Sequence, residues 1–424
     1  MEIIITELDG NVQDTIVVPD NYNDSFDSCK VEFDGLLNPS FCHEFREAIN
    51  SSNIFSDNPK YMAQYHLCCA VMDRVDTCIE KLNKYTEYPD SEEDFLVFMM
   101  FASMVTDAVK EILDQLGIFG KNNPIYGSDE DYQFFGEAYL NSSIYNPNVA
   151  IPTDEECFRY FRSLSFAHPI DTSRAKFLRK GETQYSPWVI VNREVMKSQG
   201  YDDGVGIRVY SSLEEGTLSF KMSFAVLKDY VRSRYERISL ATKWVYEQIE
   251  NVKTEWKIQK INRDQPPLDV LKEISETLEN RCESNYSIKE LIRYMECELT
   301  DMSNEKVVST YRNAIRNIIP DLCNAIDNLD HYLVEELCNS LFKRPKRMHQ
   351  MAGYQLEKIF CYLGQKGLPY SSSNELWGLQ QAKRFYEDFA NKWVNIDIEN
   401  MSHTEIQLLV RVAMFMEKIE QEKI

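Results

Sequence analysis

The chain has 424 residues, of which 43% are hydrophobic and 27% are charged, and its formal net charge is −22. This length favours two or three domains, and the composition is that of an ordinary soluble globular protein. The sequence contains no apolar run of 18 residues, which argues against a membrane-spanning helix, and the field of the acidic excess repels nucleic acid over about a Debye length.

The first elements predicted in chain order are a hairpin and two long helices. Residues 2–6 and 15–18 are rich in β-branched side chains and flank an Asp9-Gly10 turn, which predicts a β-hairpin. A short helix is expected over residues 41–49. Apolar residues then recur every three or four positions from Tyr65 to Leu82 and from Phe95 to Leu116. This spacing predicts two amphipathic helices, the second of which begins behind Ser91 and ends at Gly117.

In the middle of the chain the spacing of apolar residues changes twice, from helical to strand-like and back to helical. Thr153, followed by three acids, predicts the start of a third helix, which Pro169 should end. Residues 188–191, 206–210 and 218–224 are short and alternating, and they predict a small antiparallel β-meander. Helical spacing returns at Val226, and one long helix is expected to continue to about residue 261, before Pro266 and Pro267.

The rest of the chain predicts further helices, over residues 268–283, 287–299, 304–328, 332–342, 349–363, 374–394 and 403–421. We therefore expect a mainly α fold: a helical bundle, a small antiparallel β-meander and a C-terminal all-helical domain. The expected domains are a hairpin and polar segment at 1–57, a helical bundle at 58–186, the meander and long helix at 187–265, and the helical domain at 266–424.

Charge and cysteine content bear on partners and compartment. Residues 1–150 carry 8 Lys and Arg against 27 Asp and Glu, so the acidic excess belongs to the first third of the chain. Such a surface either docks a basic protein partner or serves solubility alone. Because the eleven cysteines are odd in number and scattered along helical faces, and the N-terminus lacks the pattern of a signal peptide, we expect a cytoplasmic protein with reduced, buried cysteines. We expect no metal ion or other cofactor.

Several catalytic motifs are absent: the chain has no G-x-S-x-G elbow, no phosphate-binding P-loop and no G-x-G-x-x-G fingerprint. The most informative segment is instead residues 157–181, which hold six basic residues and one acid. Within it, Arg162 precedes His168 by six positions, and Pro169 follows at once. Because proline disfavours helical geometry in the preceding residue, His168 should leave the helix axis. A guanidinium and a histidine are suited to phosphate chemistry.

The string from Arg162 to His168 resembles the R-x4-6-H motif of HEPN domains, which are all-helical bundles. The resemblance covers this motif and the helices before it, and Ser163 stands where active members often have Asn, Asp or His. It implies a metal-independent endoribonuclease or RNA-binding effector of a toxin or antiviral defence system, active as a homodimer. Carried over to this chain, Arg162 would contact phosphate and His168 would serve as the acid or base.

Two alternative roles for these residues stay open. Arg162 could pair with Glu155 or Glu156, and His168 could be a C-terminal helix residue stabilised by the helix dipole. The whole protein could also be a non-catalytic scaffold for protein–protein interaction whose acidic first third binds a basic partner. If RNA is the ligand, further contacts to phosphate are expected from two basic groups, which comprise Arg159, Arg174, Lys176, Arg179 and Lys180, and Lys343, Arg344, Lys346 and Arg347.

Overall fold

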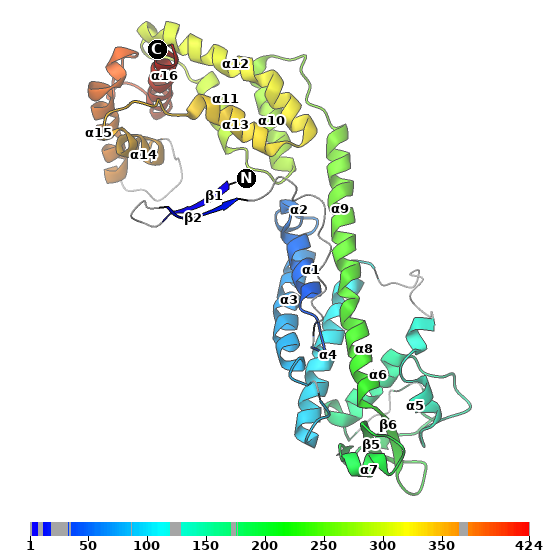
Figure 1. Ribbon diagram of the computed structural model, residues 1–424. Coiled ribbons are helices and arrows are strands. Elements are labelled where there is room, and N and C mark those ends of the chain that lie inside the picture. The colour runs from blue at the N-terminus through cyan, green and yellow to red at the C-terminus, as the bar shows by residue number, and fades with distance from the viewer. Residues whose placement is uncertain are drawn as a thin grey trace. The chain divides into compact units, whose positions relative to one another are not determined.

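The computed structural model describes residues 2–6, 12–17, 33, 35–85, 87–118, 129–170, 175, 177–363 and 372–423. These residues form two compact units (Figure 1). Unit 1 comprises residues 1–46 and 67–241, and unit 2 comprises residues 47–66 and 242–424. The fold is mainly α with a small antiparallel sheet, as the sequence predicts. The four domain segments expected from the sequence remain a prediction.

The helices of the first 170 residues follow the predicted order. They are α1 (Ser40–Asn50), α2 (Asn53–Ser56), α3 (Met62–Leu82), α4 (Glu92–Gln115), α5 (Gly136–Leu140) and α6 (Asp154–Arg162), with a 3-10 turn η1 (Asp129–Tyr132). The ends of α4 show why the pattern predicts them. Ser91 accepts a hydrogen bond from the backbone of Asp94, and Gly117 adopts a φ of 71° directly after the helix.

Aromatic side chains form the core of unit 1 around the end of α6. Phe161 of α6 contacts Phe95 of α4, with ring centroids 5.9 Å apart, and Phe220 of the sheet at 5.8 Å. Phe224 lies 4.9 Å from Phe98. All five side chains are almost completely buried. This cluster fixes α6 between α4 and the sheet, so the residues at the C-terminal end of α6 are held on a rigid support.

The predicted meander is confirmed as a four-stranded antiparallel sheet. Its strands are β3 (Gln184–Tyr185), β4 (Val189–Ile190), β5 (Gly204–Ser211) and β6 (Leu218–Ser223), with α7 (Arg193–Lys197) between β4 and β5. The central strand β5 pairs with the other three, and Gly206 lies opposite Lys221 of β6. A side chain at Gly206 would approach the Phe220 carbonyl oxygen to 3.0 Å, which explains the glycine at this position.

The N-terminal hairpin is also confirmed. Strand β1 (Glu2–Thr6) pairs antiparallel with β2 (Val12–Val17) in a sheet of its own, and β2 begins three residues earlier than predicted. The predicted Asp9-Gly10 turn lies outside the described residues.

The prediction of one long helix from residue 226 to residue 261 is wrong. Two helices replace it, α8 (Phe224–Glu236) and α9 (Ile238–Ile258), with Arg237 between them (Figure 1). The apolar spacing continues across Arg237, because Val231, Tyr235 and Ile238 are all buried. Periodicity alone could therefore not reveal the interruption.

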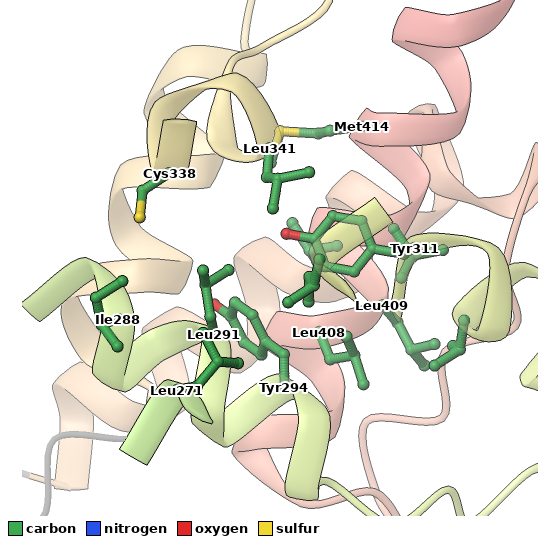
Figure 2. Packing of buried hydrophobic residues seen from close by; sticks show 14 of the residues in the cluster. Leu271, Ile288, Leu291, Tyr294, Tyr311, Cys338, Leu341, Leu408, Leu409 and Met414 are labelled. Carbon is green, nitrogen blue, oxygen red and sulfur yellow. The ribbon is translucent and has the colours of Figure 1, made fainter. Parts of the chain in front are cut away.

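Unit 2 contains the predicted series of C-terminal helices. They are α10 (Pro267–Asn280), α11 (Tyr286–Glu296), α12 (Glu305–Asn328), α13 (His331–Phe342), α14 (Ala352–Tyr362), α15 (Ser372–Asp388) and α16 (His403–Glu422), with 3-10 turns η3 (Met302–Asn304) and η4 (Ala390–Lys392). Helix α16 is central, since consecutive residues from Glu405 to Val410 are buried. A helix buried on all sides is the core element of a bundle. Figure 2 shows side chains from α10, α11, α12, α13 and α16 meeting in this core.

A buried arginine joins the ends of two helices in unit 2. Arg281 is 2% exposed, and its guanidinium donates to the carbonyl oxygens of Ile326 (2.7 Å) and Trp256 (2.9 Å). These carbonyls lie in the last turns of α12 and α9, where backbone acceptors have no partner within the helix. Burial lowers the pKa of Arg281 below its usual value, and the nearby Asp327 carboxylate opposes this shift.

The described cysteines are all reduced thiols, but not all are buried. Cys361 is exposed, and Cys69, Cys282 and Cys297 are half-buried. The expectation of uniform burial was therefore wrong at these four positions, whereas Cys42, Cys68, Cys78, Cys157, Cys323 and Cys338 lie in the interior.

Candidate functional site

The helix that carries Arg162 begins with a complete capping box. The Thr153 hydroxyl accepts from the Glu156 backbone at 3.2 Å, and the Glu156 carboxylate accepts from the Thr153 backbone at 3.1 Å. Acidic residues occupy the first turn of α6, and Arg159 and Arg162 occupy its last turn. Both charge placements stabilise the helix dipole.

The end of α6 is a π-helical turn, η2 (Ser163–Ala167), which turns the chain out of the helix. The His168 N–H donates to the Ser163 carbonyl oxygen at 2.7 Å, which closes this wider turn. His168 itself has φ −145° and ψ 61°, so it has left helical geometry immediately before Pro169, as expected. His168 is exposed to solvent. His168 is therefore not a core histidine.

Arg162 makes an ion pair that the sequence did not predict. Its side chain is 25% exposed, and its Nη1 lies 2.5 Å from Oδ2 of Asp107 on α4. The alternative partners Glu155 and Glu156 are occupied elsewhere: Glu155 binds Lys110, and Glu156 completes the capping box. A guanidinium has five N–H donors, so one exposed carboxylate leaves donors that can bind a phosphate oxygen.

The remaining basic residues of residues 157–181 have different surroundings. Arg159 is exposed, and its Nη1 atom lies 3.6 Å from Oε1 of Glu155 on the same helix. Arg179 pairs with Glu214, whereas Lys180 is exposed and has no ion-pair partner among the described residues. Two members of the group lie outside the described residues: Arg174 and Lys176.

A buried polar network, not predicted from the sequence, holds the segment that follows the motif. The Glu182 carboxylate is 6% exposed and accepts hydrogen bonds from Gln184 (2.8 Å), the Ser211 hydroxyl (2.7 Å) and the Arg179 backbone (3.0 Å). The Tyr160 hydroxyl of α6 donates to the side-chain oxygen of Gln184. The network thus ties α6 to strands β3 and β5. The sequence offered only a weak signal for this network, since Glu182 and Gln184 are two polar residues two positions apart at the start of β3.

The first residue of α6 is a second buried anchor. The Asp154 carboxylate is 0% exposed and accepts from the backbone N–H groups of Gln133 (2.8 Å), Phe134 (3.1 Å) and Phe135 (2.8 Å). Burial raises the pKa of Asp154 above its usual range, although these hydrogen bonds and Arg234 oppose the shift. Since its acceptors are satisfied by the protein, Asp154 has a structural role.

The second basic group belongs to unit 2. Lys343, Arg344, Lys346 and Arg347 are exposed in the loop between α13 and α14, and Pro345 between them is buried. The backbone of Arg347 exchanges two hydrogen bonds with the Gln421 side chain of α16, at 2.9 and 2.8 Å. The loop is therefore fixed at its base while its basic side chains extend outward.

Four acidic residues of the first third, namely Asp73, Asp76, Glu80 and Asp107, form ion pairs within the described residues of unit 1. Arg46 binds both Asp73 (3.0 Å) and Asp76 (2.6 Å) of α3, and Asp107 binds Arg162. The Glu80 carboxylate lies within 3.5 Å of the ammonium groups of Lys81 and of Lys84, which follows the end of α3. These contacts reduce the negative charge offered by α3 and α4, and the docking of a basic protein stays a prediction.

No family model, curated protein or solved structure matches this chain. None of the helices in the described residues is long and apolar enough to cross a membrane. Across the same residues, no group of three or more His, Cys, Asp and Glu side chains is placed to hold a metal ion.

Proposed function

We propose that this chain is a metal-independent endoribonuclease in which Arg162 binds the scissile phosphate and His168 transfers protons. The observation that carries the proposal is the exposure of His168 directly after the π-helical turn, at the same helix end as the partly exposed Arg162. The resemblance of the R-x5-H string to HEPN domains supports it and extends it to a toxin or antiviral role.

The chemistry needs only groups of the kind found here. The ribose 2′-oxygen attacks the adjacent phosphorus, the bond from phosphorus to the 5′-oxygen breaks, and the products are a 2′,3′-cyclic phosphate and a 5′-hydroxyl. A base takes the 2′-hydroxyl proton, and an acid gives a proton to the leaving oxygen. Histidine titrates near neutral pH and serves either step. A guanidinium stabilises the charge that develops on the phosphoryl oxygens.

Asp107 acts in this proposal as a positioning residue for Arg162. The Asp107 carboxylate is 60% exposed, so it can direct the guanidinium without removing it from solvent. The resemblance to HEPN domains implies that a second copy of the chain completes the site, and the proposal includes such a homodimer.

The test is an RNA cleavage assay on the full chain in the presence of a chelator. His168→Ala should abolish cleavage, and Arg162→Lys should reduce it by at least about a hundredfold, because an ammonium lacks the planar pair of N–H donors that makes a bidentate contact to a phosphoryl group. His66→Ala and Arg74→Lys, which change exposed residues of α3, are the matched controls and should cleave normally.

Stability separates this proposal from a structural role. His168→Ala should leave the melting temperature nearly unchanged, because the side chain is exposed. If His168→Ala cleaves RNA as fast as the unmodified chain, or lowers the melting temperature by several degrees, the assignment of His168 is wrong.

A further inference from the structure

The basic loop between α13 and α14 carries more positive charge than its surroundings neutralise. None of Lys343, Arg344, Lys346 and Arg347 forms an ion pair with any described residue. Elsewhere in unit 2, exposed lysines such as Lys272 and Lys392 contact glutamates. An unpaired basic cluster of this kind attracts a polyanion, although residues 267–424 carry an acidic excess as a whole.

Exposed aromatic side chains lie next to this loop. The Arg344 Nη1 atom lies only 3.3 Å from the position that a Cβ would take on Gly353, so the guanidinium covers the first turn of α14. Tyr354 follows Gly353 and is 40% exposed. Its hydroxyl lies 3.3 Å from Nε1 of Trp377 on α15, and Trp377 is 37% exposed.

A lysine of α14 contacts one ring of this aromatic pair. The Lys358 ammonium lies 5.3 Å from the centre of the Tyr354 ring, within the range of a cation–π contact. Helices α14 and α15 pack side by side (Figure 1), which fixes Tyr354 and Trp377 relative to each other. The rings are therefore presented as a rigid pair.

We propose that these residues form a binding surface for single-stranded nucleic acid, with Tyr354 and Trp377 stacking on bases and the loop residues Lys343, Arg344, Lys346 and Arg347 contacting phosphates. We call it the basic–aromatic surface. Stacking requires unpaired bases, so a single strand binds in preference to a duplex. An acidic peptide offers the charge but has no bases for the two rings, and the rings therefore favour nucleic acid.

The basic–aromatic surface is independent of the cleavage chemistry proposed for Arg162 and His168. It lies wholly in unit 2, whereas those two residues belong to unit 1. It adds to the proposed function a place where the substrate strand is held away from the reacting phosphate. Binding and cleavage can therefore succeed or fail separately.

The test is fluorescence anisotropy with the full chain and a labelled 2′-O-methyl oligouridylate of about fifteen nucleotides, a length within the usual range of site sizes for single-stranded nucleic acid. The 2′-O-methyl group prevents cleavage by the proposed chemistry, so only binding is measured. Trp377→Ala with Tyr354→Ala should raise the Kd by about tenfold or more. Tyr332→Ala is the control, because Tyr332 is 81% exposed at the start of α13 and belongs to neither group.

The salt dependence of binding tests the charged residues of the basic–aromatic surface. Lys346→Ala with Arg347→Ala should weaken binding and reduce the slope of log K against log salt by about 0.7 for each phosphate that the variant no longer neutralises. Circular dichroism of each variant establishes that it is folded.

Three results would overturn the inference: a Kd unaffected by both double variants, equal affinity for a duplex of the same length, or tighter binding of a polyglutamate peptide than of the oligonucleotide. If the oligonucleotide binds as expected while His168→Ala still cleaves RNA, the surface stands and the proposed catalytic site fails. If the unmodified chain cleaves RNA but binds no oligonucleotide, the catalytic site stands and the surface fails.

Discussion

Glu182 is a buried carboxylate that the fold keeps charged. Its burial favours the neutral form, but the hydrogen bonds from Ser211, Gln184 and the Arg179 backbone together hold its pKa below the usual value. Because the pKa is lowered in the folded state, these contacts stabilise unit 1 at pH values above the ordinary pKa of a glutamate, which is about 4.3. That contribution is lost as the pH falls through the folded-state pKa.

Glu182→Gln should therefore destabilise unit 1 at neutral pH, by about 1.5–3 kcal/mol, because an amide cannot accept all three hydrogen bonds. The difference in melting temperature from the unmodified chain should shrink as the pH falls from about 4.3 towards the lower folded-state pKa, because the unfolded chain is protonated first and the folded carboxylate only at the lower pH. Thermal melts across acidic and neutral pH measure it. Glu215→Gln, at an exposed position, is the control. A difference that stays constant with pH would show that the charge of Glu182 does not matter.

At single residues, the sequence predicted backbone behaviour better than side-chain partners. The departure of His168 from helical geometry follows from Pro169, which is its neighbour in the chain. The contact between Arg162 and Asp107 joins residues 55 positions apart, and only the packing of α6 on α4 creates it. The sequence suggested the neighbouring Glu155 as the partner of Arg162, but Glu155 forms its ion pair with Lys110 of α4.

A residue other than glycine adopts a left-handed backbone conformation just after helix α10. Helix α10 ends at Asn280 with Arg281 as its C-cap, and Cys282 then adopts a φ of 59°, a left-handed conformation that favours glycine. The Glu283 N–H donates to the Leu278 carbonyl oxygen at 2.9 Å, which completes the closing turn. Arg281 needs this turn to place its guanidinium on the ends of α9 and α12.

Cys282→Gly should consequently stabilise unit 2 by about 1 kcal/mol, since glycine adopts the left-handed conformation without a steric penalty. Cys282→Ala is the matched control: it also removes the thiol but keeps the Cβ atom and its strain. Melting temperatures of the two variants give the comparison. A Cys282→Gly protein no more stable than Cys282→Ala would refute the role of backbone strain here.

The extents of the elements were predictable wherever a start or stop signal stood in the sequence. Ser91, Thr153 and Pro267 mark helix starts that the structure reproduces within a residue. The break at Arg237 has no such signal, and neither does the π-helical turn after Arg162. Both depend on how the flanking helices pack, which a periodic pattern does not encode.

At the scale of the whole molecule, the candidate functional residues are divided between two units. The candidate catalytic pair lies in unit 1 and the basic–aromatic surface in unit 2. The sequence indicated both basic groups but not the aromatic partners of the second, because Tyr354 and Trp377 are 23 positions apart and meet only where α14 packs on α15. The acidic excess of the first third is partly neutralised inside unit 1, which weakens the case for a docking face on α3.

The central claim is that Arg162 and His168 cleave RNA through attack by the 2′-oxygen. Mass spectrometry of the ends produced from a single-stranded RNA, with EDTA present, tests it most directly. The account predicts 2′,3′-cyclic phosphate and 5′-hydroxyl ends from the unmodified chain, and intact RNA after incubation with His168→Ala. Ends carrying a 5′-phosphate and a 3′-hydroxyl, intact RNA with the unmodified chain, or cyclic phosphate ends formed equally by His168→Ala would contradict it.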